Sequence, residues 1–154
     1  MPRDTQGLDL DLCATAAETC TASQLRRASR AVTGAFDAAM RPVGLRSSQF
    51  SVLVGLAVAG ELPVSRLANA LGLDRTTMTR NLRPLERRGF VASGEGADRR
   101  AKVLRLTAKG RSALARALPA WQRAQERVVR ELGESRWKGL LQGLAAAGAA
   151  ARPS

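Results

Sequence analysis

The segment from Asp74 to Leu85 constrains the fold of this chain more than any other part of the sequence, because as a helix it has two opposed faces. Met78, Leu82 and Leu85 fall at positions i, i+4 and i+7 and form one apolar seam. The other face holds only hydroxyl and guanidinium side chains: Arg75, Thr76, Thr79, Arg80 and Arg83. A solvated face normally mixes in acids, so the pattern predicts a helix that packs inward on one side and offers arginines to an anionic partner on the other.

The charge of the chain points to the same kind of partner. Lys and Arg total 25 against 13 Asp and Glu, a formal net charge of +12. Between Arg66 and Arg111 there are twelve basic and four acidic residues, a net of +8. Such a field favours nucleic acid or an anionic membrane surface. A membrane-binding amphipathic helix would use bulky aromatic residues, and the chain has only three Phe and two Trp, so nucleic acid is the favoured partner.

Turn and cap residues divide the chain into an ordered series of elements. Arg41–Gly44 ends the first helix, because proline restricts the residue before it and glycine permits a turn. Asp74 is a good N-cap, and Gly89 is a good helix terminator. The predicted elements are a flexible tail over 1–12, a long helix over 14–40, a helix from Ser47 or Ser48 to about 60, a short helix ending at 71–72, a helix over 75–88, strands over 90–93 and 101–106, a helix from Thr107 to about 132 and a last helix from about 135.

This order is typical of a mainly α-helical winged helix-turn-helix protein with a small β-hairpin wing. Residues 45–107 form the predicted DNA-binding domain, with the tip of the wing at 94–98. The flanking segments, 13–44 and 108–151, carry apolar stripes that are too long for so small a core to cover. A second copy of the chain is the simplest partner for those stripes, so these segments are the predicted N- and C-terminal dimerisation helices of a homodimer.

Several short motifs occur in order and with consistent spacing over residues 25–144. They are Leu45–Leu53, Leu67-Ala68, Asp74–Leu82, Leu85-Glu86, Gly89–Val91, Asp98–Arg100 and Leu106–Gly110. Together they resemble the MarR family of bacterial regulators. The resemblance implies a homodimer that binds double-stranded DNA at a pseudo-palindromic operator, usually as a repressor. It also implies release from the operator by a small-molecule effector or by oxidation.

The charged face and the resemblance together predict the residues that contact DNA. The helix that reads the bases is the one that follows the Asp74 cap. The helix that begins at residue 47 is expected to touch phosphates. The wing carries an acid that fixes the direction of a neighbouring arginine. That acid is Asp98, and Arg99 lies at the contact with the minor groove. The predicted DNA-binding set is Ser47, Ser48 and Gln49; Arg75, Thr76, Thr77, Thr79, Arg80 and Arg83; and Arg99, Arg100 and Lys102.

A ligand pocket is expected between the dimerisation helices and the winged domain. Its candidate lining residues are Phe36, Met40, Phe50 and Trp121, with Arg27 or Arg30 as a partner for an anionic ligand. The alternative for each apolar member of this set is ordinary core packing, which is the usual role of apolar residues at helical spacing.

Cys13 and Cys20 are seven residues apart, which places both on one face of a continuous helix, about 10.5 Å apart along its axis. That separation is too long for a disulfide within one chain unless the segment unfolds. One hypothesis is a thiol switch or a soft-metal site, for arsenite for example, that joins them within or between chains. The alternative is two small apolar residues near an interface. In one branch of the family that this chain resembles, tyrosine side chains hold the thiolate of an N-terminal cysteine. This chain has no tyrosine, so that arrangement is not expected here.

Other classes of function are disfavoured. The chain has no histidine, and no pair of acids has a catalytic context, so neither an enzyme, a cofactor nor a defined metal site is expected. The main alternative to a sequence-specific regulator is an architectural protein that coats DNA without sequence preference. The ratio of the affinities for specific and random DNA distinguishes the two. The absence of a long apolar run and of a signal-peptide pattern, together with only two cysteines, predicts a cytoplasmic protein with no membrane partner.

Overall fold

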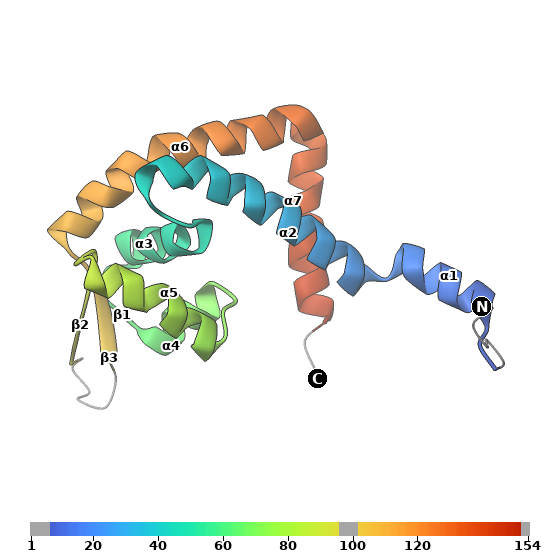
Figure 1. Ribbon diagram of the computed structural model, residues 1–154, viewed down its shortest axis with the longest axis horizontal. Helices are drawn as coiled ribbons and strands as arrows, with labels where there is room; N and C mark the ends of the chain where they lie inside the picture. The colour runs from blue at the N-terminus through green and yellow to red at the C-terminus, as the bar shows by residue number, and fades with distance from the viewer. Residues whose placement is uncertain (1–6, 96–101, 152–154) are drawn as a thin grey trace, which may run out of the picture. The chain divides into compact units, whose positions relative to one another are not determined.

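The computed structural model describes residues 7–95 and 102–151 (Figure 1). The chain divides into two compact units, Met1–Ala35 and Phe36–Ser154, which are described separately. The fold is mainly helical with one small antiparallel sheet, which confirms the predicted class. Among the described residues no single helix is long and apolar enough to cross a membrane, and only the bent pair Leu10–Val43 and Ser47–Ala59 passes on combined length and composition.

The first unit contains α1 (Leu10–Thr19) and most of α2 (Thr21–Met40). Asp9 caps α1 by accepting a hydrogen bond from the Leu12 backbone amide at 2.9 Å. The prediction of a tail to residue 12 followed by one helix over 14–40 is therefore wrong in two places. Residues 10–12 are helical, and the helix is interrupted at Cys20, whose backbone is extended.

Side chains around Cys20 explain the interruption. The Thr19 hydroxyl donates to the Thr15 carbonyl at 2.7 Å, and the Gln24 side-chain amide donates to the Glu18 carbonyl at 2.8 Å. Side-chain hydrogen bonds of this kind satisfy backbone carbonyls locally and compete with continuation of the helix. The threonines on both sides of Cys20 are β-branched, which also lowers helix propensity.

The second unit contains the remaining helices and the core. Its helical elements are η1 (Arg41–Val43), α3 (Ser47–Ala59), α4 (Val64–Ala70), α5 (Arg75–Arg87), α6 (Ala108–Leu132) and α7 (Glu134–Ala150). Each of these α-helices was predicted to within two residues at the stated bounds. Helix α3 contributes four buried apolar side chains and packs against α4, α5 and α6, so it is the centre of the core (Figure 1).

The sheet has three strands in the order β1-β3-β2, all antiparallel. Strands β2 (Val91–Glu95) and β3 (Lys102–Leu106) form the predicted hairpin, with Val91 opposite Leu106 at the base. Strand β1 (Leu62–Pro63) was not predicted. A proline is tolerated there because β1 is an edge strand, where a missing backbone donor costs little.

Thr107 joins the hairpin to α6. Its hydroxyl accepts a hydrogen bond from the Gly110 amide at 2.9 Å, as the predicted N-cap, and donates to the Gly89 carbonyl at 2.6 Å. One side chain therefore starts α6 and fixes it to the turn that follows α5. Beyond its first turns α6 leaves the core. Here and on α7 large apolar side chains are exposed: Leu118, Trp121, Leu132, Leu140, Leu141 and Leu144.

Candidate nucleic-acid interface

Helix α5 begins at a strong cap. One carboxylate oxygen of Asp74 accepts from the Thr77 backbone amide at 2.8 Å, and the other accepts from the Thr77 hydroxyl at 2.7 Å. These two hydrogen bonds favour the ionised form and lower the pKa of the Asp74 carboxyl below its usual value. The Thr77 hydroxyl proton is committed to the cap, so Thr77 of the predicted DNA-binding set has a structural role in the free protein.

The two faces of α5 lie as the sequence predicts. Met78, Leu82 and Leu85 are buried in the core. The opposite face is exposed except for the half-buried Pro84, and its residues line one shallow hollow: Arg75, Thr76, Thr79, Arg80, Arg83, Pro84 and Arg87. In the described part of the chain no acid lies within salt-bridge distance of its four arginines. We call this surface the α5 arginine face.

Two members of this face were missed from the sequence. Arg87 lies one turn beyond Arg83 and extends the positive surface to the end of the helix. Pro84 has no backbone N–H, so the carbonyl of Arg80 lacks its usual helical donor. The helical spacing of Arg80, Arg83 and Arg87, i, i+3 and i+7, was visible in the sequence and would have included Arg87.

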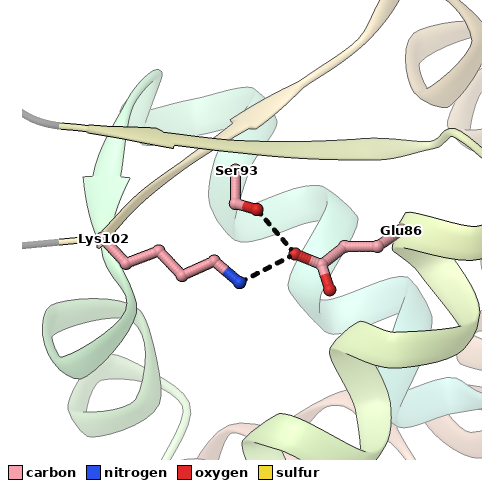
Figure 2. Close-up of polar contacts among 3 residues, drawn as sticks. All are labelled: Glu86, Ser93 and Lys102. Atoms are coloured by element: carbon pink, nitrogen blue, oxygen red, sulfur yellow. Dashed lines mark hydrogen bonds and ion pairs between the residues drawn. The ribbon is translucent and has the colours of Figure 1, made fainter.

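A polar cluster links α5 to both strands of the hairpin (Figure 2). One oxygen of the Glu86 carboxylate accepts from the Ser93 hydroxyl at 2.9 Å and from the Lys102 ammonium group at 3.2 Å. Ser93 is on β2 and Lys102 is on β3, so one acid on α5 holds both strands. The Lys102 charge, predicted to contact DNA, is thus balanced within the fold.

The start of α3 is also engaged internally. Ser47 donates to one carboxylate oxygen of Asp37 through its backbone amide at 2.7 Å and its hydroxyl at 2.6 Å. Ser48 donates to the Asn81 side-chain oxygen at 3.0 Å, and Gln49, which is 9% exposed, accepts from the Arg46 amide at 3.1 Å. All three predicted phosphate contacts therefore have partners within the fold: Ser47 ties α3 to α2, Ser48 ties α3 to α5, and Gln49 closes the first turn of α3. Burial of Gln49 argues against its predicted role.

A match to the MarR family covers residues 45–102 of this chain. The transcriptional regulator MosR of M. tuberculosis is 38% identical in a structure with a TM-score of 0.78, covering 87% of this chain and 96% of MosR. Its structure in complex with DNA is 40% identical, with a TM-score of 0.75 and coverage of 87% and 99%.

The repressor CouR, bound to a 23-mer DNA duplex, is 34% identical with a TM-score of 0.75, covering 83% of this chain and 92% of CouR. The chain belongs to the MarR family. YwoH of Bacillus subtilis (strain 168), an HTH-type transcriptional regulator, is 32% identical over 84 residues. That alignment covers 54% of this chain and 61% of YwoH, so the chain matches less than two thirds of that relative's length. The family resemblance expected from the sequence is confirmed, and these relatives are transcriptional regulators rather than enzymes.

The other predicted site residues of this MarR-family chain belong to the wing and to the candidate pocket. Asp98, Arg99 and Arg100 lie outside the described residues. Of the candidate pocket residues, Met40 and Phe50 are buried and Phe36 is half-buried.

The remaining pocket candidates fall in different units. The ring of Phe50 stacks on that of Trp121, with centroids 6.1 Å apart and an angle of 19° between planes. Phe50 therefore packs in the core, and a part for it in a ligand pocket stays a prediction. Arg27 and Arg30 are exposed residues of the first unit.

The cysteines are free thiols, Cys13 exposed and Cys20 half-exposed. The expectation that one continuous helix carries both is wrong, because α1 ends between them. Hydrogen bonds from the Ser23 side chain and backbone lower the pKa of the Cys20 thiol. Within the described residues no group of three or more Cys, Asp or Glu side chains is arranged to hold a metal ion.

Proposed function

We propose that this MarR-family chain is a sequence-specific transcriptional repressor that binds a pseudo-palindromic operator in double-stranded DNA as a homodimer. The observation that carries the proposal is the α5 arginine face. It is exposed, has no acidic member and lies opposite a buried apolar seam. A helix that is fixed on one side and presents arginines on the other suits insertion into the major groove.

The side chains of this face divide between two kinds of contact. Arginine forks suit the O6 and N7 atoms of guanine, and hydroxyls suit phosphates. Arg80 and Arg83 lie in the middle of the exposed face and are assigned to base contacts, while Arg75 and Arg87 near the two ends are assigned to phosphates. The DNA complexes of MosR and CouR, at 40% and 34% identity, support DNA as the partner.

The homodimer is supported by the exposed apolar surface of the last two helices. Leu118, Leu140, Leu141 and Leu144 are each between 44% and 48% exposed. Large apolar side chains exposed in this number on two helices are unfavourable in water and typical of an interface. We therefore assign 45–107 to DNA binding and 13–44 and 108–151 to dimerisation.

The dimer is tested by reversing the polarity of that surface. Leu140→Glu with Leu144→Glu should convert a dimer to a monomer in sedimentation experiments. Val58 is the matched control because it is an exposed apolar residue on α3, outside the proposed interface. Val58→Glu should leave the dimer intact, and a double variant that stays dimeric contradicts the assignment.

We further propose that an effector releases the protein from its operator. CouR has been solved bound to p-coumaroyl-CoA, at 32% identity, which supports a small-molecule effector. Thiol or soft-metal chemistry at Cys13 and Cys20 is the second route, supported by their accessibility. Release of labelled operator by p-coumaroyl-CoA, peroxide or arsenite, repeated with Cys13→Ser and Cys20→Ser, distinguishes the two routes.

Selection of bound duplexes from a random pool at about 150 mM salt tests the central claim, because non-specific binding is weak there. We expect a pseudo-palindrome with half-sites about 10 base pairs apart. Arg80→Ala should then cost about 1–3 kcal/mol on that operator and much less on random DNA. No enriched sequence, despite binding at low salt, would identify an architectural protein instead.

A further inference from the structure

A second group of arginines lies outside the α5 arginine face, where η1, the start of α3 and the end of α5 meet. The side chains of Arg41, Arg46 and Arg88 line a hollow of about 570 Å³ together with Asp37 and Gln49. We call this the η1 hollow. All five residues belong to the second unit.

The lining of the η1 hollow is strongly positive. No carboxylate of the described residues lies within salt-bridge distance of its three guanidinium groups. The one acid present, Asp37, uses an oxygen to accept both hydrogen bonds from Ser47. Three cations beside one engaged carboxylate leave a net positive site, which attracts an anion.

The hollow is also lined by hydrogen-bond donors that are held in place. The Arg88 guanidinium donates to the Gly44 carbonyl and lies over the Phe90 ring at 4.4 Å, which fixes its plane. A guanidinium has five N–H donors, so most remain for a ligand. Gln49 is 9% exposed and its side-chain oxygen already accepts from the Arg46 amide, which leaves the NH₂ group as the donor of that buried side chain.

We propose that the η1 hollow binds a phosphate-like oxyanion through Arg41, Arg46, Arg88 and the Gln49 amide. Guanidinium forks match the oxygens of phosphate, and a buried amide donor adds a neutral contact. The phosphate belongs either to a free small molecule or to the DNA backbone, and in the second case the inference rests on the proposed function. A bound oxyanion would bridge the end of α5 to the α2–α3 junction, so it would set the position of the helix that carries the α5 arginine face.

The first arm of the test uses inorganic phosphate and the full-length protein. Phosphate, compared with chloride at equal ionic strength, should raise the melting temperature of the wild type. Arg46→Gln should weaken phosphate binding about tenfold, as expected for loss of one charge-assisted contact. Arg46 is suited to this because its side chain is exposed and forms no ion pair with the described residues. Arg116→Gln, an exposed arginine on α6 outside the hollow, is the matched control and should leave phosphate binding unchanged.

The second arm finds the source of the phosphate by measuring binding to a random duplex at several salt concentrations. If the DNA backbone supplies it, Arg46→Gln should lower the slope of log affinity against log salt by about 0.9 relative to Arg116→Gln. An unchanged slope, with phosphate binding lost in the first arm, assigns the site to a free oxyanion.

The proposal is overturned if Arg46→Gln and Arg116→Gln weaken phosphate binding equally, or if phosphate does not bind and the slope is unchanged. A wild-type protein that binds no DNA would refute the proposed function, while the phosphate arm would still decide the η1 hollow.

Discussion

Gly110, in the first turn of α6, lies so close to Phe90 that a Cβ atom built on it would be 2.0 Å from the Phe90 carbonyl oxygen. That oxygen accepts a hydrogen bond from the Thr107 amide at 3.1 Å, so it is held in place. Only glycine permits this approach between the start of α6 and the residue before β2. The contact determines how α6 joins the DNA-binding domain.

Gly110→Ala should therefore be strongly destabilising. Overpacking a buried site costs typically about 1–3 kcal/mol, and this clash is with backbone, which yields less than a side chain. Gly148→Ala is the matched control, since a Cβ there meets nothing within 4 Å and alanine favours a helix. Urea unfolding should show a large loss for the first variant and no loss for the second. Equal stabilities would mean that α6 is not held against Phe90 as described.

Asp74 should make stability depend on pH in acid. Its pKa is lowered by the hydrogen bonds from Thr77, so the folded state favours the carboxylate. The stability from this carboxylate is fully present above the unfolded pKa of an aspartate, about 3.9, and is lost as pH falls through the lower folded pKa. Asp74→Asn keeps a capping side chain without a titratable group. Wild type should be more stable than this variant at neutral pH, and the difference in melting temperature should narrow progressively as the pH falls below about 4.

A gap that is constant from neutral to acid pH would contradict this origin. It would show that the variant differs from wild type through cap geometry alone, with no part played by ionisation of Asp74.

Lys102 should contribute little to DNA affinity, because its charge is balanced by Glu86 at 3.2 Å. Lys102→Gln is expected to leave the salt dependence of DNA binding unchanged. Arg80→Gln, which removes an unbalanced charge, should reduce that salt dependence. A double-mutant cycle between Glu86→Gln and Lys102→Gln should give a coupling of at most about 1 kcal/mol in unfolding, as exposed pairs do. A salt slope lowered by about 0.9 in Lys102→Gln would show instead that Lys102 leaves Glu86 for a phosphate.

Helix periodicity and caps were sufficient to predict α3 to α7 and the two faces of α5. Their determinants are local: Asp74 and Thr107 cap helices through residues three positions away, and Met78, Leu82 and Leu85 repeat at helical spacing. Signals of this range are visible in a sequence.

Features that depend on distant partners were not predictable. Strand β1 is two residues long and is defined by pairing with β3, about 40 positions later, so it has no pattern of its own. Gln49 and Lys102 look like free polar residues until Arg46 and Glu86 are placed beside them. The interruption at Cys20 involves a hydrogen bond from the Gln24 side chain to the Glu18 backbone carbonyl. The sequence gives no sign that Gln24 makes this bond in place of one to water.

The thiol of Cys20 should react faster than an ordinary cysteine, because hydrogen bonds from Ser23 lower its pKa and increase the fraction of thiolate at neutral pH. Ser23→Ala removes the side-chain hydrogen bond and should slow alkylation of Cys20 by iodoacetamide, with the difference vanishing at a pH where both thiols are ionised. Cys13, exposed on α1, serves as an internal control in the same sample, and its rate should not change. Site-resolved mass spectrometry over a range of pH measures both rates together. If Ser23→Ala leaves the Cys20 profile unchanged, Ser23 does not activate this thiol, and the thiol route for release of DNA would lose its main chemical support.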